Sequence, residues 1–361
     1  MTDAPAVDMP CRPEGSVSPA GYAALVWRRF RKRRQGRAGL AVLIVLLLIV
    51  LLRPVLASPL PVVCKYDGQW HFPGLVEVVR SVPLVSQVVG PSRPFGLPSF
   101  DARAAAEKST FAIKALIPYD PLAYSDAVLE PPSRAHWLGT DDVGRDVAAR
   151  LIHGAGISLG VGFGAMGVAA VVGLLLGAWA GYARGWTDAV ICRVIEAMMC
   201  FPAFFLILSV MVWVDEPGIG HVIIVIGVTG WTPIARLTRG EILRLRDSEF
   251  AVASRALGAT PRRVVFRHLL PNALAPAVVT ITFGIAHVVL LEAGLSWLGF
   301  GAPPPSPSWG NMLRSAYDHM LTAPHLVYPP CIAIFVTVLT YNWIGDALRD
   351  AVDPRTGIAH A

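Results

Sequence analysis

Long apolar runs separated by short polar segments dominate the chain. They lie at about residues 38–57, 157–182, 189–214, 218–234, 274–295 and 327–344. A helix of about 20 apolar residues crosses the ~30 Å hydrocarbon core of a bilayer, and only helices or closed barrels satisfy their backbone hydrogen bonds there. The pattern therefore predicts an all-α polytopic membrane protein with six transmembrane helices.

The pattern changes between the first two apolar runs. Residues 58–134 contain proline, glycine and charged residues throughout, and such a segment is not tolerated at membrane depth. Within it, the sequence VVCKYDGQWHF at residues 62–72 is typical of two short strands joined by a tight turn at Asp67 and Gly68. We expect an extracytoplasmic insertion with some folded structure.

The cations lie beside the apolar runs and predict the orientation of the chain. Seven fall between Arg28 and Arg37, ahead of the first run, and eight arginines fall between Arg236 and Arg267. An excess of Lys and Arg marks cytoplasmic segments, so both termini and residues 236–272 are expected inside. A cleaved signal peptide is the rival interpretation of the first run, but the basic region begins well into the chain, which favours a retained helix.

Composition supports a membrane protein. The chain is 54% hydrophobic and 16% charged, whereas soluble domains usually carry about a quarter charged residues. Its net charge of +6 lies next to apolar segments, which disfavours nucleic-acid binding. Cys64 is the only cysteine in the expected external segment, so no external disulfide framework can form within the chain.

The sequence contains no pattern typical of an enzyme or a metal site. A phosphate-binding loop needs Gly-Lys before Ser or Thr, and no lysine here follows a glycine. Asp141, Asp142, Arg145 and Asp146 lack the alternating ligands and glycine of a calcium loop. We expect them to cap the second transmembrane helix, and we expect no catalytic residue, no cofactor and no metal.

Two pairs of ionisable residues within the apolar runs are candidates for a structural or functional role. Arg193 and Glu196 are three apart and are predicted to pair on one helix face. His287 and Glu292 are five apart and point in different directions, about 140° around the helix. Either of these two could line a transport pathway, because ionisable groups inside a membrane are costly and are often functional.

The basic segment at residues 236–272 carries the most specific pattern. It reads EFAVASRALGATP at residues 249–261 and RRVVFRHLLPN at residues 262–272. This predicts two short helices joined at a corner, where Gly258 adopts a positive φ, Thr260 caps the second helix and Pro261 occupies its first position. The Leu270-Pro271 pair is expected to close the second helix before the next span.

This segment resembles the cytoplasmic coupling loop of ABC importer permeases. Their pattern is Glu-Ala-Ala, three residues, Gly, nine residues, Ile, one residue and Leu-Pro. The positions that match it are Ala253, Gly258, Leu270 and Pro271, and the positions that depart from it are Val252, Ser254 and His268. Further stretches resemble the dipeptide/oligopeptide/nickel permeases, namely HWLGTDDVGRD at 136–146, GLSWLGFG at 294–301, PSWG at 307–310 and GDALRD at 345–350.

The resemblance covers the chain from about residue 132 onward, together with the first span and the basic residues 28–37 before it. It implies a type-1 ABC importer permease in the bacterial cytoplasmic (inner) membrane, of the second-permease type with an enlarged external loop. Such a chain forms half of a translocation pathway for peptides or related small solutes. The implied partners are a second permease, two cytoplasmic ATPase subunits that hydrolyse the ATP, an extracytoplasmic substrate-binding protein and the lipid bilayer.

The resemblance also assigns the residues of the ATPase-coupling loop, which are Glu249, Ala253, Arg255, Gly258, Leu270 and Pro271. The expected divisions are a cytoplasmic basic tail at 1–37, a first transmembrane helix at 38–57, the insertion at 58–134, a five-helix permease domain at 135–348 that includes the loop at about 236–272, and a cytoplasmic tail at 349–361.

Two other functions remain open from the sequence. An ion-gradient-driven transporter would need paired ionisable residues near the membrane midplane, and these are scarce. A membrane-anchored sensing or structural protein would act through the external insertion and would form no stable complex with ATPase subunits. The sequence does not identify the cargo.

Overall fold

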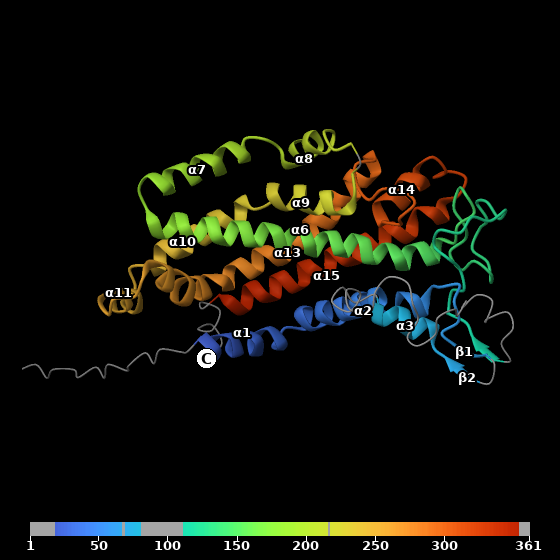
Figure 1. Ribbon diagram of the computed structural model, residues 1–361, viewed down its shortest axis with the longest axis horizontal. Helices are drawn as coiled ribbons and strands as arrows, with labels where there is room; N and C mark the ends of the chain where they lie inside the picture. Colours follow the sequence, from blue (N-terminus) through green and yellow to red (C-terminus); the bar gives the residue numbers. More distant parts are fainter. Residues whose placement is uncertain (1–18, 67–68, 81–110, 216, 354–361) are drawn as a thin grey trace, which may run out of the picture.

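Helix α6 (Val147–Ala183) runs along the centre of an elongated helical bundle (Figure 1). The computed structural model describes residues 19–66, 69–80, 111–215 and 217–353. On one side α6 packs against α9 (Ile219–Thr229) and α10 (Thr232–Leu245), and on another against α13 (Leu270–Leu298). Glycine and alanine supply many of its buried positions, and these small residues let neighbouring backbones approach closely.

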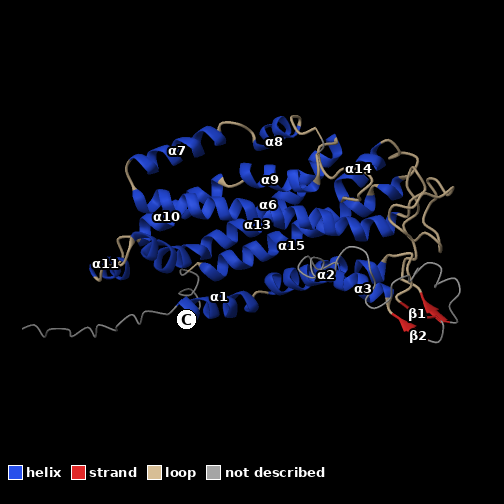
Figure 2. Cartoon of the chain, in the orientation of Figure 1, coloured by secondary structure: helices blue, strands red, loops and turns tan. Residues whose placement is uncertain are grey.

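The length and composition of the helices fit six spans. Four single helices qualify by themselves, namely α2 (Arg34–Leu56), α6, Pro261–Leu298 and Pro324–Val352. Two bent pairs qualify when each pair is counted as one span: α9 with α10, and α7 (Trp186–Met199) with α8 (Ala203–Met211). The described chain is mostly helical (Figure 2), so the predicted all-α polytopic fold is confirmed.

The span expected at residues 189–214 is not straight. Helices α7 and α8 meet at an angle of 86°, and the break falls at Phe201 and Pro202. Pro202 has no N–H to continue the helix, and its ring pushes the preceding residue out of the α region. A count of apolar residues cannot reveal such a break.

Several helices continue beyond their apolar runs. Helix α10 reaches Leu245 and α15 (Tyr328–Val352) reaches Val352, whereas the apolar runs end near residues 234 and 344. Residues 236–245, expected in the loop, therefore form a helix that packs on α6. Two of its arginines form ion pairs: Arg239 binds Asp188 of α7 at 2.5 and 2.8 Å, and Arg244 binds Glu241 at 2.8 Å.

The remaining elements lie at the two ends of the bundle. A three-stranded sheet of β1 (Val63–Tyr66), β2 (Gln69–His71) and β3 (Phe111–Ile113) has the order β2-β1-β3. Lys65 pairs with Trp70, which confirms the two predicted strands; the turn predicted at Asp67 and Gly68 lies outside the described residues. Strand β3 was not predicted. Helices α3 (Pro73–Arg80) and α14 (Trp309–Tyr317) lie near this end, and α1 (Pro19–Lys32) and α11 (Glu249–Ala256) near the other (Figure 1).

Three expected segments fall partly outside the described residues. These are residues 1–18 of the N-terminal tail, 81–110 of the insertion and 354–361 of the C-terminal tail. The described part of the N-terminal tail is mostly helical, since α1 is followed by α2 from Arg34.

Candidate functional site

The corner after α11 has the geometry that its sequence predicts. Gly258 has a φ of 81°. The Ala259 N–H donates to the Ser254 carbonyl at 3.1 Å, and the Gly258 N–H donates to the Arg255 carbonyl at 2.9 Å. These two bonds form a Schellman motif, in which the residue after the helix cap takes the left-handed conformation. A glycine adopts that conformation without strain.

The second helix begins directly after the corner. The Thr260 hydroxyl accepts the N–H of Arg263 at 3.4 Å, and Pro261 occupies the first helical turn. Both predictions for these residues are confirmed. The chain therefore reverses over Leu257 to Thr260 without leaving the helix ends uncapped.

The prediction that Leu270-Pro271 closes the second helix is wrong. Helix α12 (Pro261–Arg263), a π-helix (Val264–Leu269) and α13 form one continuous helix from Pro261 to Leu298. The Leu270 N–H donates to the Val265 carbonyl, five residues back. The wide π-turn lets the helix accept Pro271, which lacks an N–H and would clash with a carbonyl in a regular turn.

Buried contacts fasten α11 to the helical bundle. Ala251 is fully buried in a cluster with Ile242 of α10, Val264 and Leu269. Arg255 donates to the Arg246 carbonyl at 2.9 Å, and the buried Arg246 guanidinium donates to the Gly181 and Tyr182 carbonyls at the end of α6. These contacts connect α11 with α6, α10 and α13.

The outer face of the corner is exposed and carries apolar side chains next to Arg262 and Arg263. Leu257 is 89% exposed, and Phe250, Val252 and Phe266 are about half exposed. Glu249, Ala253, Gly258 and Pro271 are also exposed, whereas Arg255 and Leu270 are half-buried. Apolar side chains grouped on a protruding corner are typical of a protein–protein contact. We call this face, formed by α11 and the residues up to Phe266, the corner surface.

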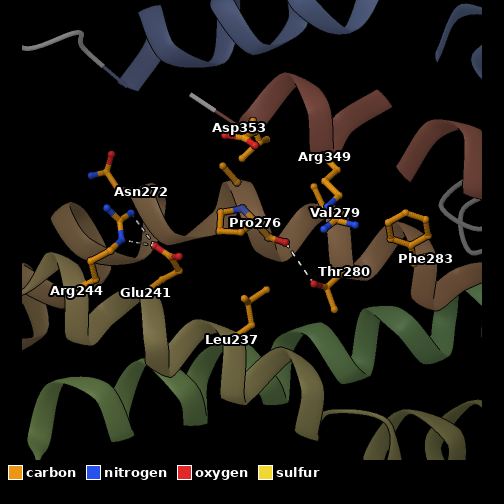
Figure 3. A pocket seen from close by; sticks show the side chains of 12 residues that line it. Leu237, Glu241, Arg244, Asn272, Pro276, Val279, Thr280, Phe283, Arg349 and Asp353 are labelled. Atoms are coloured by element: carbon orange, nitrogen blue, oxygen red, sulfur yellow. Dashed lines mark hydrogen bonds and ion pairs between the residues drawn. The ribbon is translucent and has the colours of Figure 1, made fainter. Parts of the chain in front are cut away.

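A cavity of about 630 Å³ opens beside the corner, between α10, α13 and α15. Figure 3 shows Glu241 and Arg244 on α10, joined at 2.8 Å, opposite Arg349 and Asp353 at the end of α15. The α13 wall is formed by Asn272, Ala275, Pro276, Val279, Thr280 and Phe283. The cavity thus offers charges of both signs on an otherwise largely apolar wall.

The two residues proposed to line a pathway lie in different environments. His287 is exposed and lies about 40° around the helix from Phe283, so it continues the face of α13 that lines the cavity. Glu292 is fully buried. Its carboxylate accepts from Ser296 at 2.6 Å and from Ser158 of α6 at 3.3 Å. We retain the pathway prediction for His287 alone.

The Glu292 network ties three helices together. Ser158 accepts the backbone N–H of Trp309 at 3.1 Å, and the Trp309 indole donates to the Leu151 carbonyl. The sequence offered no sign of this network, because Ser158 lies 134 residues before Glu292. From the loop before α14, the Ser308 hydroxyl also lies 3.3 Å from the Ser296 hydroxyl of α13.

Other predicted pairs are present. Arg193 and Glu196 bind at 2.7 Å, with both side chains exposed. Asp146 caps α6 by accepting the Ala149 N–H at 2.7 Å. Arg145 binds Asp141 at 2.7 Å, so the acidic cluster is held by arginine contacts at the start of α6.

Comparison with known proteins gives two family matches. The family described as binding-protein-dependent transport system inner membrane component matches residues 173–358. The model described as the N-terminal TM domain of oligopeptide transport permease C matches residues 21–69.

Named relatives and solved structures are also similar. The glutathione transport system permease protein GsiD of Pectobacterium atrosepticum is 39% identical over 242 residues, which are 66% of this chain and 80% of the relative. The dipeptide transport system permease protein DppC of Alkalihalophilus pseudofirmus is 40% identical over 227 residues, 63% of this chain and 74% of the relative. The inward-facing MetNI methionine ABC transporter overlaps at a TM-score of 0.47 with 22% identity, over 56% of this chain and 96% of that chain.

Proposed function

Because this chain belongs to the family of binding-protein-dependent transport system inner membrane components, and to its peptide-permease branch, we propose that its corner surface couples ATP hydrolysis in separate subunits to solute movement. The chain is a permease subunit of an ABC importer and a multi-pass inner-membrane protein. The observation that carries the proposal is the Gly258 corner, which presents exposed apolar residues while its buried side is fastened to α6, α10 and α13.

The proposed partners follow from the family and from this surface. Two cytoplasmic ATPase subunits serve the complex, and one of them docks on this chain's corner surface; the hydrolysis occurs there, so this chain is not itself an enzyme. A second permease completes the pathway, and an extracytoplasmic substrate-binding protein delivers the cargo. The relatives named for glutathione and dipeptides support a short peptide as cargo.

Purified complexes test this function. Transport by proteoliposomes that contain the whole assembly should need ATP and the loaded binding protein, and should stop with vanadate. Uptake that persists without ATP but collapses with a protonophore would instead support an ion-gradient-driven transporter. Failure of the chain to associate with any ATPase subunit would favour a sensing or structural role.

Orientation is a separate proposal, in which the corner faces the cytoplasm and the sheet end faces outward. The arginine-rich segment between α10 and α13 supports it. In a cysteine-free background, a membrane-impermeant thiol reagent applied from outside should label Ala123→Cys, which is exposed. It should label Leu257→Cys only after permeabilisation. The opposite labelling pattern would invert the topology.

We also assign the cavity between α10, α13 and α15 to the inner end of the translocation pathway, with His287 farther along it. Replacing His287 by Ala should raise the KM for transport about two- to tenfold, the equivalent of one hydrogen bond to the cargo. Abundance and ATP dependence should persist. Val278 is a matched control, because it is exposed on α13 but lies about 180° around the helix. Equal effects of His287→Ala and Val278→Ala would remove the assignment.

A further inference from the structure

The N-terminal helix α1 carries an unbalanced positive charge. Seven cations lie within ten residues, at Arg28, Arg29, Arg31, Lys32, Arg33, Arg34 and Arg37, and no Asp or Glu occurs between residues 15 and 66. Arg33 pairs with Asp350 at 3.4 Å, and Arg29 donates to the Asp353 carbonyl at 3.4 Å. The other five cations are exposed and have no carboxylate partner within the described residues.

Besides the polar contacts of Arg29 and Arg33, one aromatic side chain packs α1 against the end of α15. Phe30 is 2% exposed and packs with Ile344, Ala347 and Ala351 of α15. Gly36, at the start of α2, lies so close that an added Cβ would fall 2.8 Å from the Ala347 Cβ. The helix is thus held against α15 at the same end of the bundle as the cavity (Figure 1).

The opposite side of α1 is cationic. Arg28 and Lys32 are four residues apart and lie about 160° to 200° around the helix from Phe30. Trp27 is 50% exposed and stacks on Phe30, with ring centroids 5.6 Å apart. A tryptophan beside cations at the end of a transmembrane helix is typical of a segment at the level of the lipid headgroups.

We propose that α1 binds the headgroups of anionic phospholipids and that this contact sets the position of the end of α15. Charge complementarity supports this ligand. Because α1 joins α2 within one residue, its exposed cations lie at the membrane surface, where anionic headgroups can bind them. Polybasic segments next to a transmembrane helix are attracted to anionic leaflets. Arg349, Val352 and Asp353 at the end of α15 line the cavity, so the lipid contact reaches the inner end of the pathway.

The transport part of this inference rests on the proposed function, whereas the lipid-binding part does not. The first measurement is therefore the number of phosphatidylglycerol molecules retained by the purified complex in native mass spectrometry. The Arg28→Gln/Arg31→Gln/Lys32→Gln variant keeps Arg33, Arg34 and Arg37 to maintain orientation. Each cation near an anionic surface contributes about fivefold to binding, so this variant should weaken retention on the order of a hundredfold. The charge-conserving Arg28→Lys/Arg31→Lys variant should retain lipid normally.

The second measurement is transport in vesicles of phosphatidylcholine with and without phosphatidylglycerol. The native complex should be stimulated by phosphatidylglycerol and the Gln variant should not, while both should have equal activity in phosphatidylcholine alone. Phe30→Ala should still retain lipid but lose the stimulation, because α1 loses its buried apolar contact with α15. Normal lipid retention by the Gln variant, or full stimulation of either variant, would overturn the inference. Absence of ATP-driven transport in every vesicle would instead refute the proposed function.

Discussion

A Gly258→Val permease is expected to insert normally, reach normal abundance and fail to transport. The φ of 81° at this position is accessible to glycine, but a β-branched residue there costs about 1–3 kcal/mol. No neighbouring atom lies within 4 Å of an added Cβ, so the whole effect comes from the backbone. The corner would relax to another conformation and the corner surface would lose its shape.

The spans do not depend on this corner, because their apolar surfaces are buried elsewhere. Transport and the stimulation of ATPase activity by loaded binding protein should therefore fall together, measured in proteoliposomes with the complete complex. Gly258→Asn should be milder, since asparagine tolerates the left-handed region.

Gly240→Val is the matched control for this experiment. Gly240 is exposed in α10, has no positive φ and also has open space around it. Full coupling in the Gly258→Val complex, or equal losses in both variants, would show that the corner does not transmit the signal.

The second large effect is expected at Gly177, where α6 crosses α10. A Cβ added there would lie 2.9 Å from the Ala235 Cα and from the Thr238 Cβ. Gly177→Leu would force the two helices apart, and overpacking of this kind costs about 1–3 kcal/mol or more. Because α10 leads into the corner, both folding and coupling should suffer.

Gly167→Leu makes the same change in the same helix where nothing lies within 4 Å. Thermal unfolding of the detergent-purified permease should show a lower midpoint for Gly177→Leu and little change for Gly167→Leu. Equal midpoints would mean that α6 and α10 do not pack as closely as the structure shows.

The sequence predicted those features that depend on neighbouring residues. The left-handed Gly258, the Thr260 cap and the Asp146 cap each follow from the chemistry of a few adjacent positions. Apolar runs predicted six spans, because membrane thickness restricts helix length. The resemblance supplied the function, which composition and spacing alone could not.

Features that depend on distant contacts could not be predicted. Arg246 is one of eight arginines in its segment, and only the fold shows that it binds the end of α6. Glu292 and His287 were equal candidates in the sequence. In the structure, Ser158, Ser296 and Ser308 surround Glu292, whereas His287 is exposed. The π-turn before Pro271 was also hidden, because the same Leu-Pro pair is compatible with a helix end.

One continuous helix, Pro261 to Leu298, connects the corner with the opposite end of the bundle, so its two ends move together if it stays straight. A helix rises ~1.5 Å per residue, so the arm from Pro261 to Pro276 is about 22 Å long and the arm from Pro276 to Leu298 about 33 Å. Pro276, which lies inside this helix and lines the cavity, separates the two arms. If the corner docks an ATPase subunit as proposed, a rigid tilt of this helix about Pro276 would move its far end about 1.5 Å in the opposite direction for each ångström at the corner.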